Sequence, residues 1–122
     1  MENYTSEEFV VALQVVSSSI SNCEKIQPKF MEGTSQHTLL KNRIKALYIS
    51  KSLILNENVR DNYSKEELIE ALRPVSSIIK KCEKAQEKFD EGTPHHTRFK
   101  NLISAMYISK ALITDMLNRY ED

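Results

Sequence analysis

The sequence predicts an all-α fold: a four-helix bundle built from two tandem helical-hairpin repeats that are related by internal pseudo-two-fold symmetry. Helix-breaking residues are scarce, with two glycines and three prolines among 122 residues. The chain also repeats itself, because more than half of the residues in 4–54 are identical to those at the corresponding positions of 63–113. Within each repeat, apolar residues recur at the three- and four-residue spacing of amphipathic helices. One hairpin cannot cover its own apolar face, whereas two hairpins can cover each other.

The length of the chain corresponds to a single domain, residues 1–122, which can bury a modest core without disulfides or metal. Repeat one is placed at residues 4–57 and repeat two at 63–120. A polar connector, residues 56–62, lies between them.

The first helix of each repeat begins with a capping box. In this motif a hydroxyl and a glutamate three residues later satisfy free N–H groups of the first turn. Thr5 pairs with Glu8 in repeat one, and Ser64 pairs with Glu67 in repeat two. The apolar seam that follows consists of Phe9, Leu13, Val16, Ile20, Cys23, Gln27 and Phe30, with Leu68, Leu72, Val75, Ile79, Cys82, Gln86 and Phe89 as its counterparts.

The second helix of each repeat follows a glycine. Gly33 and Gly92 are expected to end the first helices, since glycine adopts a left-handed closing turn at little cost. Thr34 and Thr93 can then cap the next helices, and Pro94 suits a first turn. The second helices are predicted at about 35–55 and 94–120.

Two prolines interrupt the predicted first helices. Pro74 is expected to kink or break the helix near Leu72, because proline lacks a backbone N–H and its ring clashes with the preceding turn. Pro28 is expected to loosen the last turn of the equivalent helix.

A polar stripe runs along one face of each second helix and is identical in the two repeats. Its members are four and three residues apart, which places them on one side of a helix. Charges elsewhere on the same helix differ between the repeats, as with Lys45 and Ser104 or Arg43 and Leu102. The stripe consists of His37, Lys41, Ile44, Tyr48 and Lys51 in repeat one, and of His96, Lys100, Ile103, Tyr107 and Lys110 in repeat two.

The composition of the stripe predicts a cavity for a small phosphate-bearing ligand. Lysine neutralises phosphate, histidine donates a hydrogen bond, and tyrosine stacks or donates. The free N–H groups and positive dipole of the helix that starts after Gly33 favour an anion as well. The predicted ligand-binding residues are His37, Lys41, Tyr48, Lys51, His96, Lys100, Tyr107 and Lys110, together with Thr34, Thr38, Thr93 and Thr97.

Structural interpretations of the same residues stay open. The histidines can bond a neighbouring carbonyl, the tyrosines can lie at the edge of the core, and the threonines can serve as helix caps. Lys41 and Lys100 can form surface pairs with Glu24 and Glu83. Lys51 and its counterpart in repeat two can extend along apolar surface to reach water.

The two cysteines, Cys23 and Cys82, occupy equivalent positions in the seam and are expected to be reduced core thiols. A zinc site formed by them with His37 and His96 is rejected. Cys23 lies about two helical turns from His37, on the order of 10 Å along the axis, whereas zinc ligands lie at roughly 2.0–2.3 Å. No metal and no cofactor are expected.

Several classes of function are not expected. No catalytic motif and no nucleophile–base pair stands out, so the protein is not expected to be an enzyme. Lysine and arginine number 17, as do aspartate and glutamate, so no basic face for DNA is expected. The start of the chain does not resemble a signal peptide, and no apolar run approaches the roughly 18 residues of a membrane span. A cytoplasmic protein is therefore predicted.

The run EKAQEKFDEGTPHHTRFKNLISAMYISKALI and its first-half counterpart share a G-T-x-x-H-T-x-x-K pattern. In this they resemble small helical proteins of unknown function from Firmicutes and their phages. The resemblance covers both repeats and implies no established activity. By analogy, it suggests the anti-defence role of a phage or prophage sponge, which sequesters the nucleotide signals of bacterial defence systems.

The leading hypothesis is a non-enzymatic binding protein that sequesters a small anionic, nucleotide-like ligand. The alternative is a helical interaction or inhibitor module that docks a protein partner. Exposed apolar residues that differ between the repeats, such as Leu39 and Leu102, would then matter more than the stripe. Homodimerisation is open under either hypothesis.

Overall fold

The computed structural model describes residues 4–120, and the all-α prediction is confirmed for them. They form four α-helices and one short 3-10 helix, and no strand occurs among these residues. The elements are α1 (Ser6–Ile26), η1 (Gln27–Lys29), α2 (Ser35–Ile54), α3 (Lys65–Gln86) and α4 (Pro94–Tyr120).

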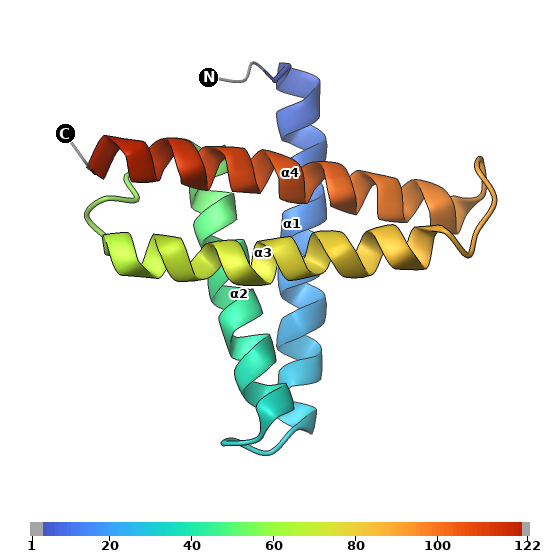
Figure 1. The fold of residues 1–122 in the computed structure, drawn as a ribbon, viewed down its shortest axis with the longest axis horizontal. Helices are drawn as coiled ribbons and strands as arrows, with labels where there is room; N and C mark the ends of the chain where they lie inside the picture. The colour runs from blue at the N-terminus through green and yellow to red at the C-terminus, as the bar shows by residue number, and fades with distance from the viewer. Residues whose placement is uncertain (1–3, 121–122) are drawn as a thin grey trace.

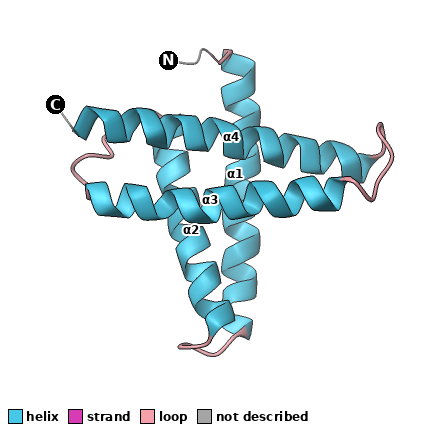
Figure 2. Cartoon of the chain, in the orientation of Figure 1, coloured by secondary structure: helices cyan, strands magenta, loops and turns pink. Residues whose placement is uncertain are grey.

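The four helices form two antiparallel hairpins that lie in two layers and cross each other (Figure 1). Helices α1 and α2 make one hairpin, α3 and α4 make the other, and their tips point in different directions. Short loops connect all the helices (Figure 2). Each helix contributes a fully buried side chain to the core, namely Val16, Leu47, Val75 and Met106.

Both predicted capping boxes are present. The backbone N–H of Glu8 donates to Thr5 Oγ1 at 3.1 Å, and the N–H of Thr5 donates to Glu8 Oε1 at 2.9 Å. Ser64 and Glu67 repeat this arrangement at the start of α3, with the same two distances. The hydroxyl and the glutamate therefore set where each hairpin begins.

The first helix of each hairpin ends earlier than predicted, at Ile26 and Gln86 rather than at the glycines. In the first hairpin the 3-10 turn around Pro28 follows α1, as expected from the proline. A tight turn then reverses the chain, and the N–H of Thr34 closes it on the carbonyl of Met31 at 3.2 Å. Gly33 lies inside this turn with φ 92, so its left-handed conformation belongs to the turn and not to the helix end.

The predicted break at Pro74 is wrong. Helix α3 continues through this proline, and Figure 1 shows no sharp bend in it. Pro74 is buried, and so are its neighbours Ala71 and Val75 on the same helix. Proline inside a helix costs about 3 kcal/mol, but burial of a single large apolar side chain recovers about 1.5–3 kcal/mol, and α3 buries several. Tertiary packing therefore holds the helix together.

The connector between the hairpins, predicted to be polar, contributes one apolar residue to the core. Val59 is only 1% exposed and belongs to the core. Its carbonyl accepts hydrogen bonds from the N–H groups of Asn62, at 3.1 Å, and Tyr63, at 2.9 Å. The buried side chain of Val59 thus anchors the connector to the core.

Candidate functional site

The predicted polar stripe lies on α2 and α4, largely at the surface. Lys41, Tyr48 and their counterparts in repeat two are exposed, and so is Lys110, whereas both stripe histidines and Lys51 are partly buried. Lys45 forms an ion pair with Glu67, whereas no lysine of the stripe takes part in one among residues 4–120.

The tyrosines of the stripe bond to glutamates of the neighbouring helix. Tyr48 Oη donates to Glu24 Oε2 at 2.9 Å, and Tyr107 Oη donates to Glu83 Oε2 at 3.4 Å. The predicted pairing of Glu24 with Lys41 is therefore wrong, because the phenol reaches this carboxylate across the hairpin and the lysine does not pair with it. The repeated contact bridges the two helices of each hairpin.

The threonines divide into caps and exposed residues. Thr34 Oγ1 accepts from the N–H of His37 and Thr93 Oγ1 from that of His96, both at 3.3 Å. Each cap hydroxyl also donates to a turn carbonyl at 2.7 Å. The cap prediction is confirmed for these two, whereas Thr38 and Thr97 lie exposed one turn further along.

Four depressions lie along the grooves between the hairpins, and Thr97 is the one predicted ligand-binding residue that lines any of these four. The smallest lies where the hairpins cross, has a volume of about 190 Å³ and receives residues from all four helices. We refer to it as the crossing pocket. It is lined by Ser19, Asn22, Cys23, Arg43, Leu47, Ile78, Lys81, Cys82 and Leu102.

Arg43 is the notable side chain of the crossing pocket. Its Nε and Nη2 atoms are shielded from solvent and have no hydrogen-bond partner among the described residues. The lining contains no carboxylate, while Lys81, an exposed residue of the lining, adds a second positive charge. A shielded guanidinium without an acceptor is costly, because the lost hydration is not replaced. The crossing pocket is therefore a cationic cavity that lacks an anion of its own.

The two cysteines face this same pocket and leave the charge of Arg43 uncompensated. Burial raises the pKa of the Cys23 and Cys82 thiols, although the positive charge of Arg43 acts on both in the opposite direction. Both side chains are buried free thiols, as predicted, and stay neutral near pH 7.

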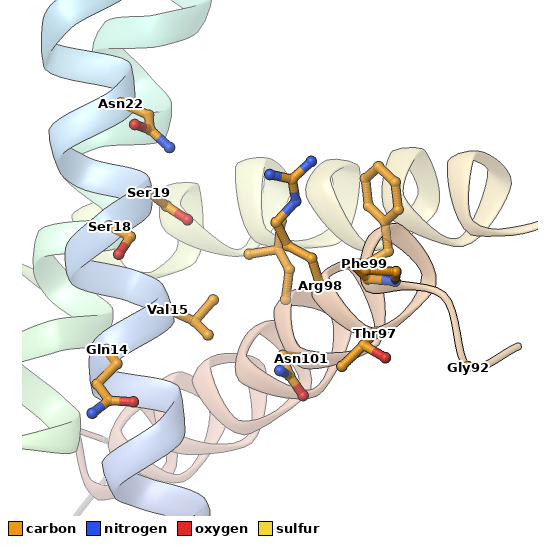
Figure 3. Close-up of a pocket in the computed structure, with 12 residues that line it drawn as sticks. Gln14, Val15, Ser18, Ser19, Asn22, Gly92, Thr97, Arg98, Phe99 and Asn101 are labelled. Carbon is orange, nitrogen blue, oxygen red and sulfur yellow. The ribbon is translucent and has the colours of Figure 1, made fainter. Parts of the chain in front are cut away.

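A larger open groove adjoins the crossing pocket and has a volume of about 770 Å³. It runs between α1 and the first turns of α4, and we call it the α1/α4 groove. Figure 3 shows Gln14, Ser18 and Asn22 on α1, across the groove from Arg98 and Asn101 on α4. The groove and the crossing pocket share three lining residues, Ser19, Asn22 and Leu102.

Arg43 was not predicted as a site residue because its counterpart in repeat two is Leu102. A charged residue that differs between the repeats is typical of an exposed position without a specific role. A signal was nevertheless present. Arg43 follows Leu40 by three residues and precedes Leu47 by four, so it shares a helix face with two buried leucines.

Within residues 4–120, no group of three or more metal-binding side chains comes together, and no helix has the length and apolar character needed to cross a bilayer. Comparison with known protein families, with curated proteins and with solved structures finds no match to the chain.

Proposed function

We propose that the protein is a non-enzymatic binder of a small anionic, nucleotide-like ligand, which it holds in the crossing pocket. The observation that carries this proposal is the pair of shielded guanidinium nitrogens of Arg43, Nε and Nη2, which have no hydrogen-bond partner among the described residues. A phosphate oxygen would supply the missing acceptors, and guanidinium groups bind such oxyanions in a two-bonded geometry. Lys81 would add charge, while Ser19 and Asn22 would donate further hydrogen bonds.

The size of the crossing pocket suits the charged group of such a ligand. Its volume of about 190 Å³ corresponds to about six water molecules at roughly 30 Å³ each, enough for a tetrahedral oxyanion. Pockets for whole drug-sized molecules have roughly 300–1,000 Å³. The remainder of a nucleotide would therefore lie outside the crossing pocket.

The two hairpins are further proposed to be products of a duplication, related by an approximate two-fold axis through the crossing pocket. The lining supports this arrangement, because eight of the nine residues form four pairs at equivalent positions of the two repeats. The pairs are Ser19 with Ile78, Asn22 with Lys81, Cys23 with Cys82, and Arg43 with Leu102.

Binding without chemical conversion would lower the free concentration of the ligand. This is the action of a sponge, and a phage or prophage protein that sequesters a nucleotide signal of bacterial defence would act in this way. The stripe residues, which do not line the crossing pocket, would form a separate site.

The test replaces Arg43 by the residue that repeat two carries at the same position. Thermal unfolding is measured for wild type and Arg43→Leu with phosphate, mononucleotides, cyclic dinucleotides and ADP-ribose derivatives. A ligand at a hundred times its Kd adds about 2.7 kcal/mol to the stability of the wild type. Arg43→Leu is expected to abolish this gain. It is also expected to raise the free energy of unfolding of the ligand-free protein by about 1–2 kcal/mol, because an unpartnered charge is removed.

Two further variants make the test specific. Arg73→Gln also replaces an arginine by its repeat counterpart, but Arg73 is exposed and lies outside the crossing pocket, so ligand stabilisation should persist. A Lys51→Ala/Lys110→Ala double variant tests the stripe. Ligand stabilisation that survives Arg43→Leu and disappears in the double variant would contradict the crossing pocket and favour the stripe.

A protein-docking function is the second candidate, and exposed apolar residues favour it. Leu39 is 44% exposed and Ile69 is 50% exposed, and both line the groove between α2 and α3. Leu102, by contrast, is partly buried. Loss of partner binding in Leu39→Ala/Ile69→Ala, with no ligand stabilisation in any protein of the panel, would support docking over ligand binding.

A further inference from the structure

The charged residues of the crossing pocket are distributed unevenly between its two sides. Three of its four equivalent pairs differ in residue type, and the two that differ in charge place their cations on the same side. Arg43 and Lys81, on α2 and α3, oppose Leu102 and Asn22, on α4 and α1. One side thus carries both cations, whereas the other is neutral. A cavity with this charge distribution favours one anion in one orientation rather than two equivalent anions.

The neutral side of the pocket is the side that continues into the α1/α4 groove. Ser19, Asn22 and Leu102 line both cavities. The groove has apolar surface from Val15 and Phe99, hydrogen-bonding side chains and one cation, Arg98, and its lining contains no carboxylate. Its volume of about 770 Å³ lies in the range of small-molecule sites.

The corresponding groove between α2 and α3 is built differently. It has a volume of about 600 Å³, but Glu67 and Glu70 line it, and Glu67 pairs there with Lys45. Carboxylates repel an anionic ligand, and two of them line this groove beside the cation Arg73, whereas none lines the α1/α4 groove. The part of a ligand that extends from the crossing pocket is therefore favoured in the α1/α4 groove alone.

From this asymmetry we infer that the ligand is an organic phosphate of mononucleotide size, bound once per chain with its phosphate between Arg43 and Lys81 and its uncharged, hydrogen-bonding part in the α1/α4 groove. The inference rests on the proposed function, since it requires an anion at Arg43. It adds the orientation, the stoichiometry and the chemical class. Inorganic phosphate would fill the crossing pocket alone, and a nucleoside without phosphate would fill the α1/α4 groove alone.

The experiment compares AMP, inorganic phosphate and adenosine as probes in isothermal titration of the full chain. Asn101→Trp blocks the α1/α4 groove with an exposed bulky ring, and Asn42→Trp is the matched control. Asn42 is the same residue at the equivalent position, is exposed as well, and lines the α2/α3 groove. Circular dichroism confirms that each variant is folded before titration.

Wild type is expected to bind AMP with a stoichiometry of one and at least about tenfold more tightly than inorganic phosphate. Asn101→Trp should weaken AMP by at least about tenfold and leave phosphate unchanged, whereas Asn42→Trp should alter neither. Arg43→Leu should bind neither AMP nor phosphate.

Three results would overturn the inference. AMP affinity could be unchanged in Asn101→Trp, it could be reduced equally in Asn42→Trp, or it could fail to exceed the affinity for phosphate in the wild type. The proposed function survives these outcomes while Arg43→Leu still loses phosphate. Absence of both AMP and phosphate binding in wild type overturns both.

Discussion

Arg43 and Leu102 show what one side chain can change between two halves of similar sequence. The two residues occupy the same position of their repeats and line the same pocket, yet one brings a charge and the other an apolar surface. The charge costs stability in the free protein, since Nε and Nη2 have no acceptor. The anion proposed for the crossing pocket would supply these acceptors.

The contact between Tyr48 and Glu24 can be tested by titration. The hydrogen bond to the Glu24 carboxylate raises the pKa of the Tyr48 phenol above its ordinary value, and partial desolvation acts in the same direction. Because the folded-state pKa is the higher one, the contact stabilises the protein below the ordinary tyrosine pKa of about 10. This stabilisation is lost as the pH rises through the folded-state pKa.

Glu24→Gln is therefore expected to lower the pKa of Tyr48. The measurement is the tyrosinate absorbance as a function of pH, with the Tyr48→Phe protein subtracted to assign the transition. Glu83→Gln, which alters the equivalent contact in the other hairpin, should leave the pKa of Tyr48 where it is. A Tyr48 transition that does not move in Glu24→Gln would show that the hydrogen bond does not persist in solution.

At the scale of helices, α3 shows the strongest conflict between local preference and packing. Pro74 removes a backbone hydrogen bond from the middle of the helix, and its repeat counterpart in α1 is Val15. Both flanking turns bury apolar residues, among them Leu68 and Ile78. The helix persists because these neighbours pack against the rest of the core, not because its sequence favours it locally.

Pro74→Val is expected to raise the free energy of unfolding by about 1–3 kcal/mol, because it restores the N–H and keeps a side chain of similar size. The denaturant midpoint, with an unchanged m-value, measures the gain. The reverse change, Val15→Pro, should destabilise by about 3 kcal/mol or more. A loss of stability in Pro74→Val would show that the shape of the proline ring matters more to the packing than the missing hydrogen bond.

At the scale of the whole molecule, the two hairpins cross each other (Figure 1). Both hairpins contribute residues to the core and to the lining of the crossing pocket. The connector contributes to this arrangement through Val59, which is part of the core. Nearby, Tyr120 Oη donates to the carbonyl of Tyr63 at 2.7 Å, and the guanidinium of Arg60 lies 5.1 Å from the centre of the Tyr120 ring. The start of the second hairpin is thereby tied to the end of α4.

Val59→Ala is expected to lower the free energy of unfolding by about 2 kcal/mol, because it removes fully buried methyl groups and leaves a cavity. The same substitution at Val10, which is 55% exposed, should change stability by no more than about 0.5 kcal/mol. Chemical denaturation of both proteins makes the comparison. Equal effects of the two substitutions would contradict an anchored connector.

The sequence by itself determined the helices and most of their boundaries, since these depend on interactions within a few residues. Capping boxes at Thr5 and Ser64, caps at Thr34 and Thr93, and the apolar periodicity all act locally. The continuity of α3 through Pro74 and the burial of Val59 depended on packing from distant segments, and local patterns do not report such packing.

The pocket was decided by the tertiary structure alone. Arg43 and Lys81 are far apart in the chain, and they line one cavity only because the hairpins cross at that point. A repeated stripe within one helix is visible in a sequence, whereas a site assembled from four helices requires their relative orientation. That orientation follows from the fit of two apolar faces, to which every core residue contributes and which no short motif encodes.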